Sequence, residues 1–194
     1  MAPHHLGVDD ILDLRAYERV RESYRRHVIE LKRRRRVALG PILTAVFECA
    51  DTVRFQVQEM ARAERITTDE GIRRELNIYN QLLPERGELS ATVFVELTTE
   101  EDLRHWLPRL VGIERTLAFE LGDPTAAVVP SVPESTHAQA LTRETVTAAV
   151  HYVRFVFPAD ARARVWAREP MVLAARHPEY EARAVLPEAV HDEL

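Results

Sequence analysis

The sequence predicts a single α+β domain, with a mainly antiparallel sheet, a long basic N-terminal helix and several packing helices. Apolar residues recur at helical spacing over residues 9–34, which indicates one long amphipathic helix. Alternating apolar and polar residues indicate strands at 42–49, 52–60, 89–97 and 146–157. The strands occur in hairpins and singly between helices, without a strict βα alternation, and this arrangement favours an antiparallel sheet.

Length and composition agree with one domain. At 194 residues, with 46% hydrophobic and 29% charged residues, the chain can bury a sizeable core. We expect a flexible tail at 1–8 and one domain over 9–194, made of a basic amphipathic helix at 9–36 and a sheet-containing body at 37–194. The single cysteine, Cys49, excludes an internal disulfide and favours a reducing compartment.

The sequence shows no targeting or membrane segment. No run approaches the ~20 apolar residues that a membrane-spanning helix needs, and residues 1–10 lack the basic and apolar regions of a secretion signal. The last four residues, HDEL, match a retention signal of the endoplasmic reticulum. We interpret this match as coincidental because no secretion signal accompanies it. A cytoplasmic protein is expected.

The first helix is strongly basic. Residues 15–36 hold ten Arg or Lys against three Glu, a local charge of +7 in a chain of net charge −5. The basic run at 32–36 suits the C-terminal end of a helix dipole. We expect the helix to lie against the acidic body or an acidic partner. Nucleic-acid binding is disfavoured, because no aromatic residues interleave the run and the net charge is negative.

A polar hairpin is expected next. The strand at 42–49 reverses at Ala50-Asp51 and returns as 52–60, where Val53, Phe55 and Val57 alternate with polar residues. Such a hairpin would bury one face and present the other. The two glutamines and the interleaved acids and arginines that follow exceed what solubility requires.

Each later element has a local signal. Thr68 predicts the start of a helix, and Thr98 or Thr99 predicts the start of another at 100–110. Pro158 and Pro187 mark the beginnings of two C-terminal helices. Further strands are expected at 116–121, 126–129, 172–175 and 183–186. A Pro-containing connection is expected at 122–141.

The hairpin and the helix after it supply the candidate binding residues. Side-chain amides both donate and accept hydrogen bonds, which suits a polar ligand or another backbone. The alternative is that the neighbouring acids and arginines pair with one another in a salt-bridge network. The candidates for ligand or partner binding are Glu48, Gln56, Gln58, Glu59, Arg62, Glu64, Arg65, Glu75, Tyr79 and Asn80.

A metal site is a further hypothesis. Fingerprints for nucleotide binding, zinc proteases and serine hydrolases are absent from the sequence. His151 shares a strand face with apolar residues, which is typical of a core histidine, but it could also meet glutamates across the sheet. Glu48, Glu59 and His151 would then form an oxygen-rich site suited to Fe or Mn.

The stretches LGPILTAVFE and TVRFQVQEMARAERI, followed by ELNIYNQLLP and ELSATVFVEL, resemble the bacterial domain-of-unknown-function family 3501. The resemblance extends from the N-terminal helix to the HPEY turn and is densest from Leu39 to Glu96. Members of that family are often encoded beside rubrerythrin-like proteins and iron–sulfur oxidoreductases. The resemblance therefore implies a role in a redox or peroxide-handling system.

Two functional hypotheses follow. The first is a non-catalytic accessory or ligand-binding protein of such a system, which binds a partner protein or a polar ligand through the Glu48–Arg65 face. The resemblance implies a rubrerythrin-like or iron–sulfur oxidoreductase partner, and self-association into a homo-oligomer is a further option. The alternative is a metal-dependent enzyme with a carboxylate/histidine site, in which arginines hold an anionic substrate.

Overall fold

The computed structural model describes residues 5–122, 126–134 and 146–193. Its centre is one eight-stranded antiparallel sheet, with strand order β1-β2-β3-β6-β5-β4-β7-β8. The α+β fold with an antiparallel sheet is therefore confirmed. The strands are β1 (Arg36–Leu39), β2 (Leu43–Phe47), β3 (Glu88–Val95), β4 (Leu117–Leu121), β5 (Ala127–Pro133), β6 (Val150–Val156), β7 (Met171–His177) and β8 (Tyr180–Val185).

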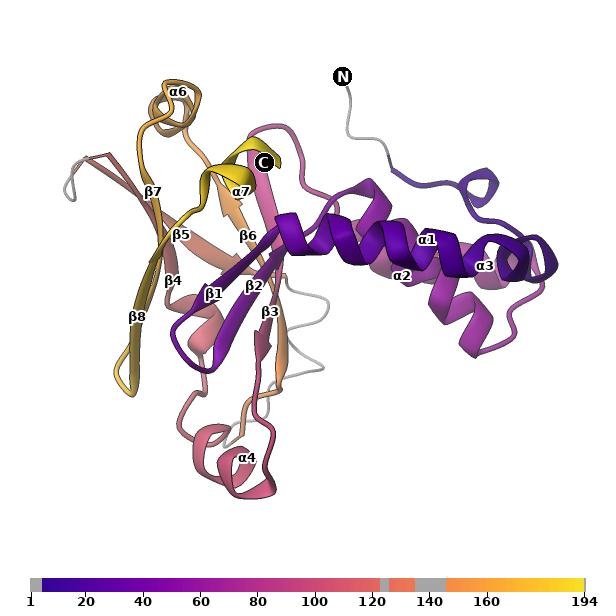
Figure 1. Cartoon of the computed structure of the whole chain (residues 1–194), viewed down its shortest axis with the longest axis horizontal. Helices are drawn as coiled ribbons and strands as arrows, with labels where there is room; N and C mark the ends of the chain where they lie inside the picture. The colour runs from indigo at the N-terminus through magenta and orange to yellow at the C-terminus, as the bar shows by residue number, and fades with distance from the viewer. Residues whose placement is uncertain (1–4, 123–125, 135–145, 194) are drawn as a thin grey trace.

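The sheet curls into a nearly closed barrel, which brings its two outer strands together (Figure 1). The Tyr180 hydroxyl of β8 donates a hydrogen bond of 2.7 Å to the Leu39 carbonyl of β1. Gly40, which follows, has a φ of +73°, and a Cβ there would lie 2.3 Å from that hydroxyl. Glycine is thus required at the β1–β2 turn both by its conformation and by the close approach of β8.

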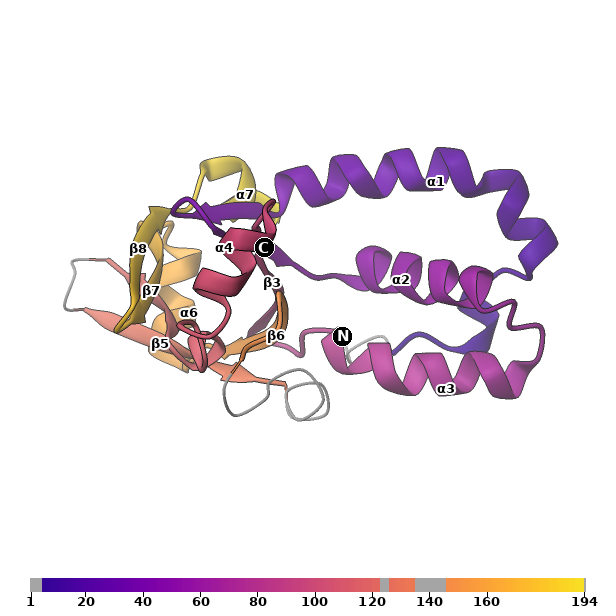
Figure 2. The ribbon, with the colours of Figure 1, turned by 90° about the horizontal axis from the view of Figure 1, so that it is seen from below.

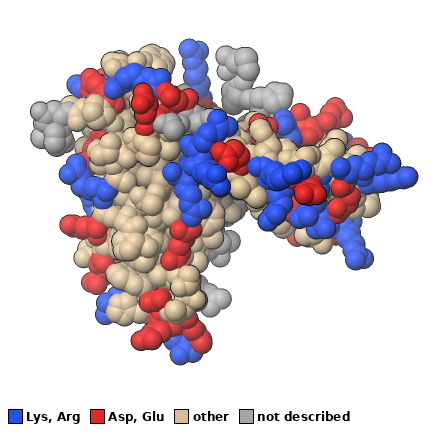
Figure 3. All heavy atoms as spheres, viewed as in Figure 1, with Lys and Arg blue, Asp and Glu red and all other residues tan. Residues whose placement is uncertain are grey.

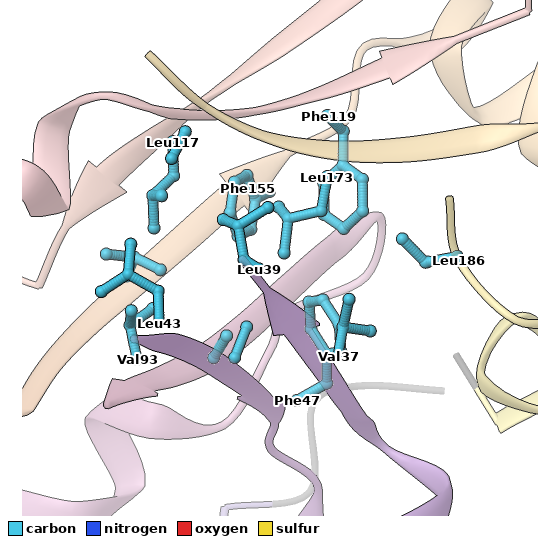
Figure 4. Close-up of a cluster of buried hydrophobic side chains, with 14 of the residues drawn as sticks. Val37, Leu39, Leu43, Phe47, Val93, Leu117, Phe119, Phe155, Leu173 and Leu186 are labelled. Atoms are coloured by element: carbon cyan, nitrogen blue, oxygen red, sulfur yellow. The ribbon is translucent and has the colours of Figure 1, made fainter. Parts of the chain in front are cut away.

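The barrel interior holds the main core. Alternate residues of each strand point inward, as strand geometry requires, and Figure 4 shows these side chains meeting from opposite walls. Phe119 occupies the middle, with its ring 4.7 Å from that of Phe155 and 5.8 Å from that of Phe47, measured between centroids. Burial of these rings is the main stabilising contribution of the barrel.

Three helices form an arm that extends away from the barrel (Figures 1 and 2). They are α1 (Leu14–Arg34), α2 (Ala50–Ala63) and α3 (Asp69–Tyr79). A second apolar cluster joins α2 to α3, with Val57 and Ala61 packed among Ile72 and Leu76. We call these three helices the arm.

Short helices complete the fold. Thr99 caps α4 as predicted, by accepting a hydrogen bond of 3.0 Å from the Asp102 N–H. Among the described residues, no helix is both long and apolar enough to cross a membrane. The remaining helices of the described residues are η1 (Val8–Asp10), η2 (Asn80–Leu82), α4 (Glu100–Trp106), η3 (Ile113–Arg115), α6 (Ala159–Trp166) and α7 (Glu188–Glu193).

The predicted return strand at 52–60 is wrong, because these residues form the middle of α2. Val53, Val57 and Ala61 recur at every fourth position, which is a helical period hidden under the alternating one. Packing against α3 selects the helical period. The hairpin partner of β2 is β1 instead, with Leu39 paired to Leu43.

Two further expectations differ from the structure. Within the tail expected at 1–8, Leu6 is buried and exchanges two hydrogen bonds of 3.0 Å with the Asn80 amide, while residues 1–4 lie outside the described residues. The strand expected at 126–129, within the connection at 122–141, is longer than predicted, because β5 runs from Ala127 to Pro133; residues 123–125 and 135–141 also lie outside the described part of the chain.

Candidate functional site

A cavity of about 190 Å³ lies where the arm meets the outer face of the barrel. Its walls come from both parts: α1 and α2 from the arm, β3 and β6 from the sheet, and Glu48 from the segment between β2 and α2. We call it the junction cleft. Its polar and aromatic lining includes Lys32, Glu48, Gln56, Thr92, Phe94 and Tyr152.

Glu48 is at the base of the junction cleft. It directly follows Phe47, whose ring points into the barrel, so strand alternation directs the Glu48 side chain to the outer face. The residue is only 7% exposed, and the hydroxyls of Thr52 and Thr92 each donate to one of the carboxylate oxygens. Each carboxylate oxygen can accept a second hydrogen bond, so Glu48 can still bind a donor.

Lys32 supplies a positive charge to the same cleft. It is half-buried near the C-terminal end of α1. The described residues offer its ammonium neither a hydrogen bond nor an ion pair. A half-buried ammonium without a partner is a natural binding point for an anionic group.

Tyr152 lines the cleft and Tyr79 is hydrogen-bonded to the cleft residue Gln56, and both tyrosines stay protonated at neutral pH. Burial raises the pKa of Tyr152, and Tyr79 and Glu48 add to the effect. Burial likewise raises the pKa of Tyr79, while a hydrogen bond to Gln56 lowers it in part. Both phenols are therefore hydrogen-bond donors rather than phenolates, which suits binding more than proton abstraction.

The side-chain amides of the candidates Gln58 and Asn80 bind backbone groups of this chain, not those of a partner. Gln58 is 1% exposed, accepts from the Leu12 N–H at 3.0 Å and donates to the Leu12 carbonyl at 2.8 Å. Asn80 forms the same reciprocal pair with Leu6. The two amides hold the N-terminal segment against the arm.

Glu59 and Arg62 join α2 to α1. Arg21 donates two hydrogen bonds of 2.8 Å to the Glu59 carboxylate, and the Tyr17 hydroxyl donates another of 2.7 Å. The Arg21 hydrogen bond is the main reason that the pKa of Glu59 is lowered. Arg62 pairs with Glu18. For these two residues, the structure therefore agrees with the alternative prediction, in which neighbouring acids and arginines form salt bridges.

The other candidates lie farther from the cleft. Glu64 and Arg65 are exposed at the end of α2, where Arg65 has a left-handed φ of 55°. Glu75 is half-buried on α3, and its pKa is raised by burial and by Glu64. Of the predicted binding residues, the structure brings Glu48, Gln56 and the adjacent Tyr79 together and places the rest elsewhere.

The three candidate metal ligands are not brought together. Glu48 faces the outside of the barrel, whereas Glu59 lies on α2 and is bound by Arg21 of α1. His151 points inside, where its Nδ1 lies 3.7 Å from the buried Glu114 carboxylate. Burial lowers the pKa of His151, and Glu114 partly opposes this. Among the described residues, no group of three or more His, Cys, Asp or Glu could hold a metal ion.

Sequence reasoning missed most of the cleft lining, including Lys32, Thr92 and Tyr152. Tyr152 could have been found, because it directly follows the inward-facing His151 on a predicted strand and must face outward. It is paired with Thr92 across β3 and β6. Lys32 had no such signal, since its position depends on how the arm packs on the sheet.

Comparison with known proteins places the chain in a family. A family model described as a protein of unknown function, DUF3501, matches residues 5–194. The chain belongs to the DUF3501 family. A crystal structure of a novel protein of unknown function from Burkholderia pseudomallei K96243 is 34% identical and has a TM-score of 0.87. The match covers 97% of this chain and 96% of that one. No curated protein matches the chain.

Proposed function

We propose that this DUF3501 protein is an accessory, ligand-binding protein whose junction cleft takes a small polar molecule. The observation that carries the proposal is that one cavity is lined both by the Lys32 ammonium, which has no partner among the described residues, and by the buried Glu48 carboxylate. Gln56 and Tyr152 add groups that can donate and accept beside them.

Size and charge define the ligand class. The cleft volume of about 190 Å³ equals roughly six water molecules at ~30 Å³ each. It lies below the ~300 Å³ of pockets for drug-sized ligands. A carboxylate on the ligand would meet Lys32, and an ammonium or hydroxyl group would meet Glu48. The best match is a short zwitterion of amino-acid type.

Because the cleft lies between the arm and the sheet, ligand binding would affect how the two are arranged. Because Lys32 and Gln56 belong to the arm while Thr92 and Tyr152 belong to the sheet, a bound ligand would contact both and favour one arrangement of the two. We propose that the arm then presents a surface to a partner protein. The family resemblance makes a rubrerythrin-like or iron–sulfur oxidoreductase the expected partner, within a redox or peroxide-handling system.

The charge of the arm favours an acidic partner surface. Lys and Arg side chains gather over the arm, interleaved with some acids (Figure 3). On α1, several arginines are exposed and have no ion-pair partner among the described residues, namely Arg15, Arg19, Arg25 and Arg26. Exposed charges of one sign accelerate association with an opposite surface, and salt weakens the effect.

Thermal unfolding in the presence of glycine, alanine and serine tests the ligand proposal. A ligand at about 100 times its Kd stabilises the fold by ~2.7 kcal/mol, which is about 5–10 °C in Tm for a chain of this size. We expect at least one of these zwitterions to raise the Tm, and its N-acetyl and methyl-ester derivatives to do so less. Equal effects of the charged and the blocked compounds, or no effect of any, would refute the proposal.

Variants locate the effect. Lys32→Met removes the ammonium and should weaken binding about tenfold, or ~1.4 kcal/mol. Arg26→Met removes an exposed charge from the same helix outside the cleft and should leave binding unchanged. If both variants bind as the wild type does, the ligand site lies elsewhere.

A further inference from the structure

A second cavity lies at the end of the barrel between α6, α7 and the start of β3. Its volume is about 320 Å³, and it shares no lining residue with the junction cleft. Apolar side chains form its floor: Leu89, Phe157, Val165 and Met171. Of these, Phe157 and Met171 are also part of the barrel core. The apolar side of the cavity is therefore continuous with the barrel core.

Two arginines give this cavity a net positive charge. Arg86 and Arg162 line it, together with His191 of α7. Its acidic residue, Glu88, is already bound by Arg154, at 2.6 Å. The described residues give the Arg86 side chain no hydrogen bond or ion pair. A cavity with this charge balance suits an anion.

Arg162 is held in place with most of its donors unused. Its NH1 donates to the Phe157 carbonyl at 2.8 Å, which fixes the guanidinium beside the cavity. The side chain lies across Gly87, where a Cβ would come within 3.0 Å of it and where φ is +85°. A guanidinium has five N–H donors, so several are left for a ligand.

His191 presents a buried donor that lacks an acceptor. Its Nδ1 lies 3.0 Å from Arg168 NH1, and because arginine only donates, Nδ1 must accept. The proton of the neutral ring is therefore on Nε2. Among the described residues, no atom accepts a hydrogen bond from this buried Nε2. An oxygen of a ligand in the cavity would provide the acceptor.

Trp166 completes the site at its rim. Its side chain is 75% exposed and lines the cavity next to Val165. A large exposed aromatic side chain beside an apolar floor is suited to cover the apolar part of a ligand. We propose that this cavity binds a small amphipathic carboxylate, with its carboxylate on Arg162, Arg86 and His191 and its aromatic or branched part on the apolar floor.

Fluorine NMR of 4-fluorophenylacetate with the full chain tests this proposal, with the neutral 4-fluorophenylacetamide as the matched control. We expect saturable broadening or shift of the acid signal and much weaker binding of the amide. Equal binding of both probes would overturn the assignment of a carboxylate site, and so would a failure of the acid to bind at millimolar concentration.

Three variants place the binding in this cavity. Arg162→Met should weaken binding of the acid about tenfold or more, as expected for hydrogen bonds to a charged group. Arg86→Met should weaken it about two- to fivefold. The Arg86 side chain has no hydrogen bond or ion pair with the described residues, so we expect this variant to fold normally. Arg19→Met, on the arm, should bind as the wild type does. Unchanged binding in Arg86→Met and in folded Arg162→Met would contradict the proposal.

Discussion

Gln56 and Gln58 are two residues apart, and the structure gives them different roles. Gln58 is fully buried and bonds both polar groups of Leu12, whereas Gln56 is half-buried in the junction cleft. Gln58→Ala removes two hydrogen bonds and leaves a void, so we expect a loss of about 1–3 kcal/mol in the free energy of unfolding. Gln56→Ala should change it by less than ~0.5 kcal/mol. Urea unfolding measures both, and equal losses would contradict this assignment.

Glu59 gives stability that depends on pH. Its pKa is lowered in the folded protein, so its contribution is complete above the ordinary value of 4.5 and is lost as the pH falls through the folded value. Glu59→Gln should cost about 1–2 kcal/mol at neutral pH and less near pH 3, because the contribution of the ion pair decreases as the pH falls below 4.5. Glu70→Gln, at an exposed pair on α3, is the control and should have little effect at either pH. A cost of Glu59→Gln that does not change with pH would exclude the ion pair as its cause.

At this scale, the sequence identified part of the cleft. Glu48 and Gln56 could be selected because they are polar side chains within a short stretch that also contains regularly spaced apolar residues. Thr92 and Tyr152 reach the cleft through a pairing between β3 and β6 that lies 60 positions apart in the chain. Such a contact depends on sheet order, which no local spacing reveals.

The helix caps are features of single elements, and local sequence predicts them well. Thr68 accepts a hydrogen bond of 3.2 Å from the Gly71 N–H at the start of α3. We expect Thr68→Ala to cost about 0.5–2 kcal/mol. Thr67→Ala, one position earlier and exposed, should cost almost nothing. Thermal unfolding of the two variants distinguishes them, and equal values would show that the cap contributes nothing.

The helix α2 shows why some elements could not be predicted. Its residues satisfy an alternating and a helical pattern at once, so periodicity alone cannot decide between them. The helical choice buries Val53, Val57 and Ala61 against α3 and the N-terminal segment. That burial is a property of the assembled arm. In residues 89–97 only the alternating pattern was evident, and β3 was predicted within two residues of its bounds.

Closure of the barrel belongs to the whole molecule. Tyr180 joins the first strand to the last through the Leu39 carbonyl, and its burial raises the pKa of its phenol. Tyr180→Phe keeps the ring and removes the bond, which should cost about 1–2 kcal/mol. Hydrogen exchange should then become faster in both β1 and β8. Faster exchange in β8 alone would contradict a role in closure.

The joining of arm and barrel is the central feature of the whole molecule, because the junction cleft exists only between them. Backbone NMR shifts during titration with the zwitterion that most raises the Tm test this directly. We expect the shifted amides to cluster at Lys32, Gln56, Thr92 and Tyr152, on both sides of the cleft, and to be lost in Lys32→Met. Shifts confined to the barrel or to the arm alone, or none at all, would contradict a ligand site at the junction.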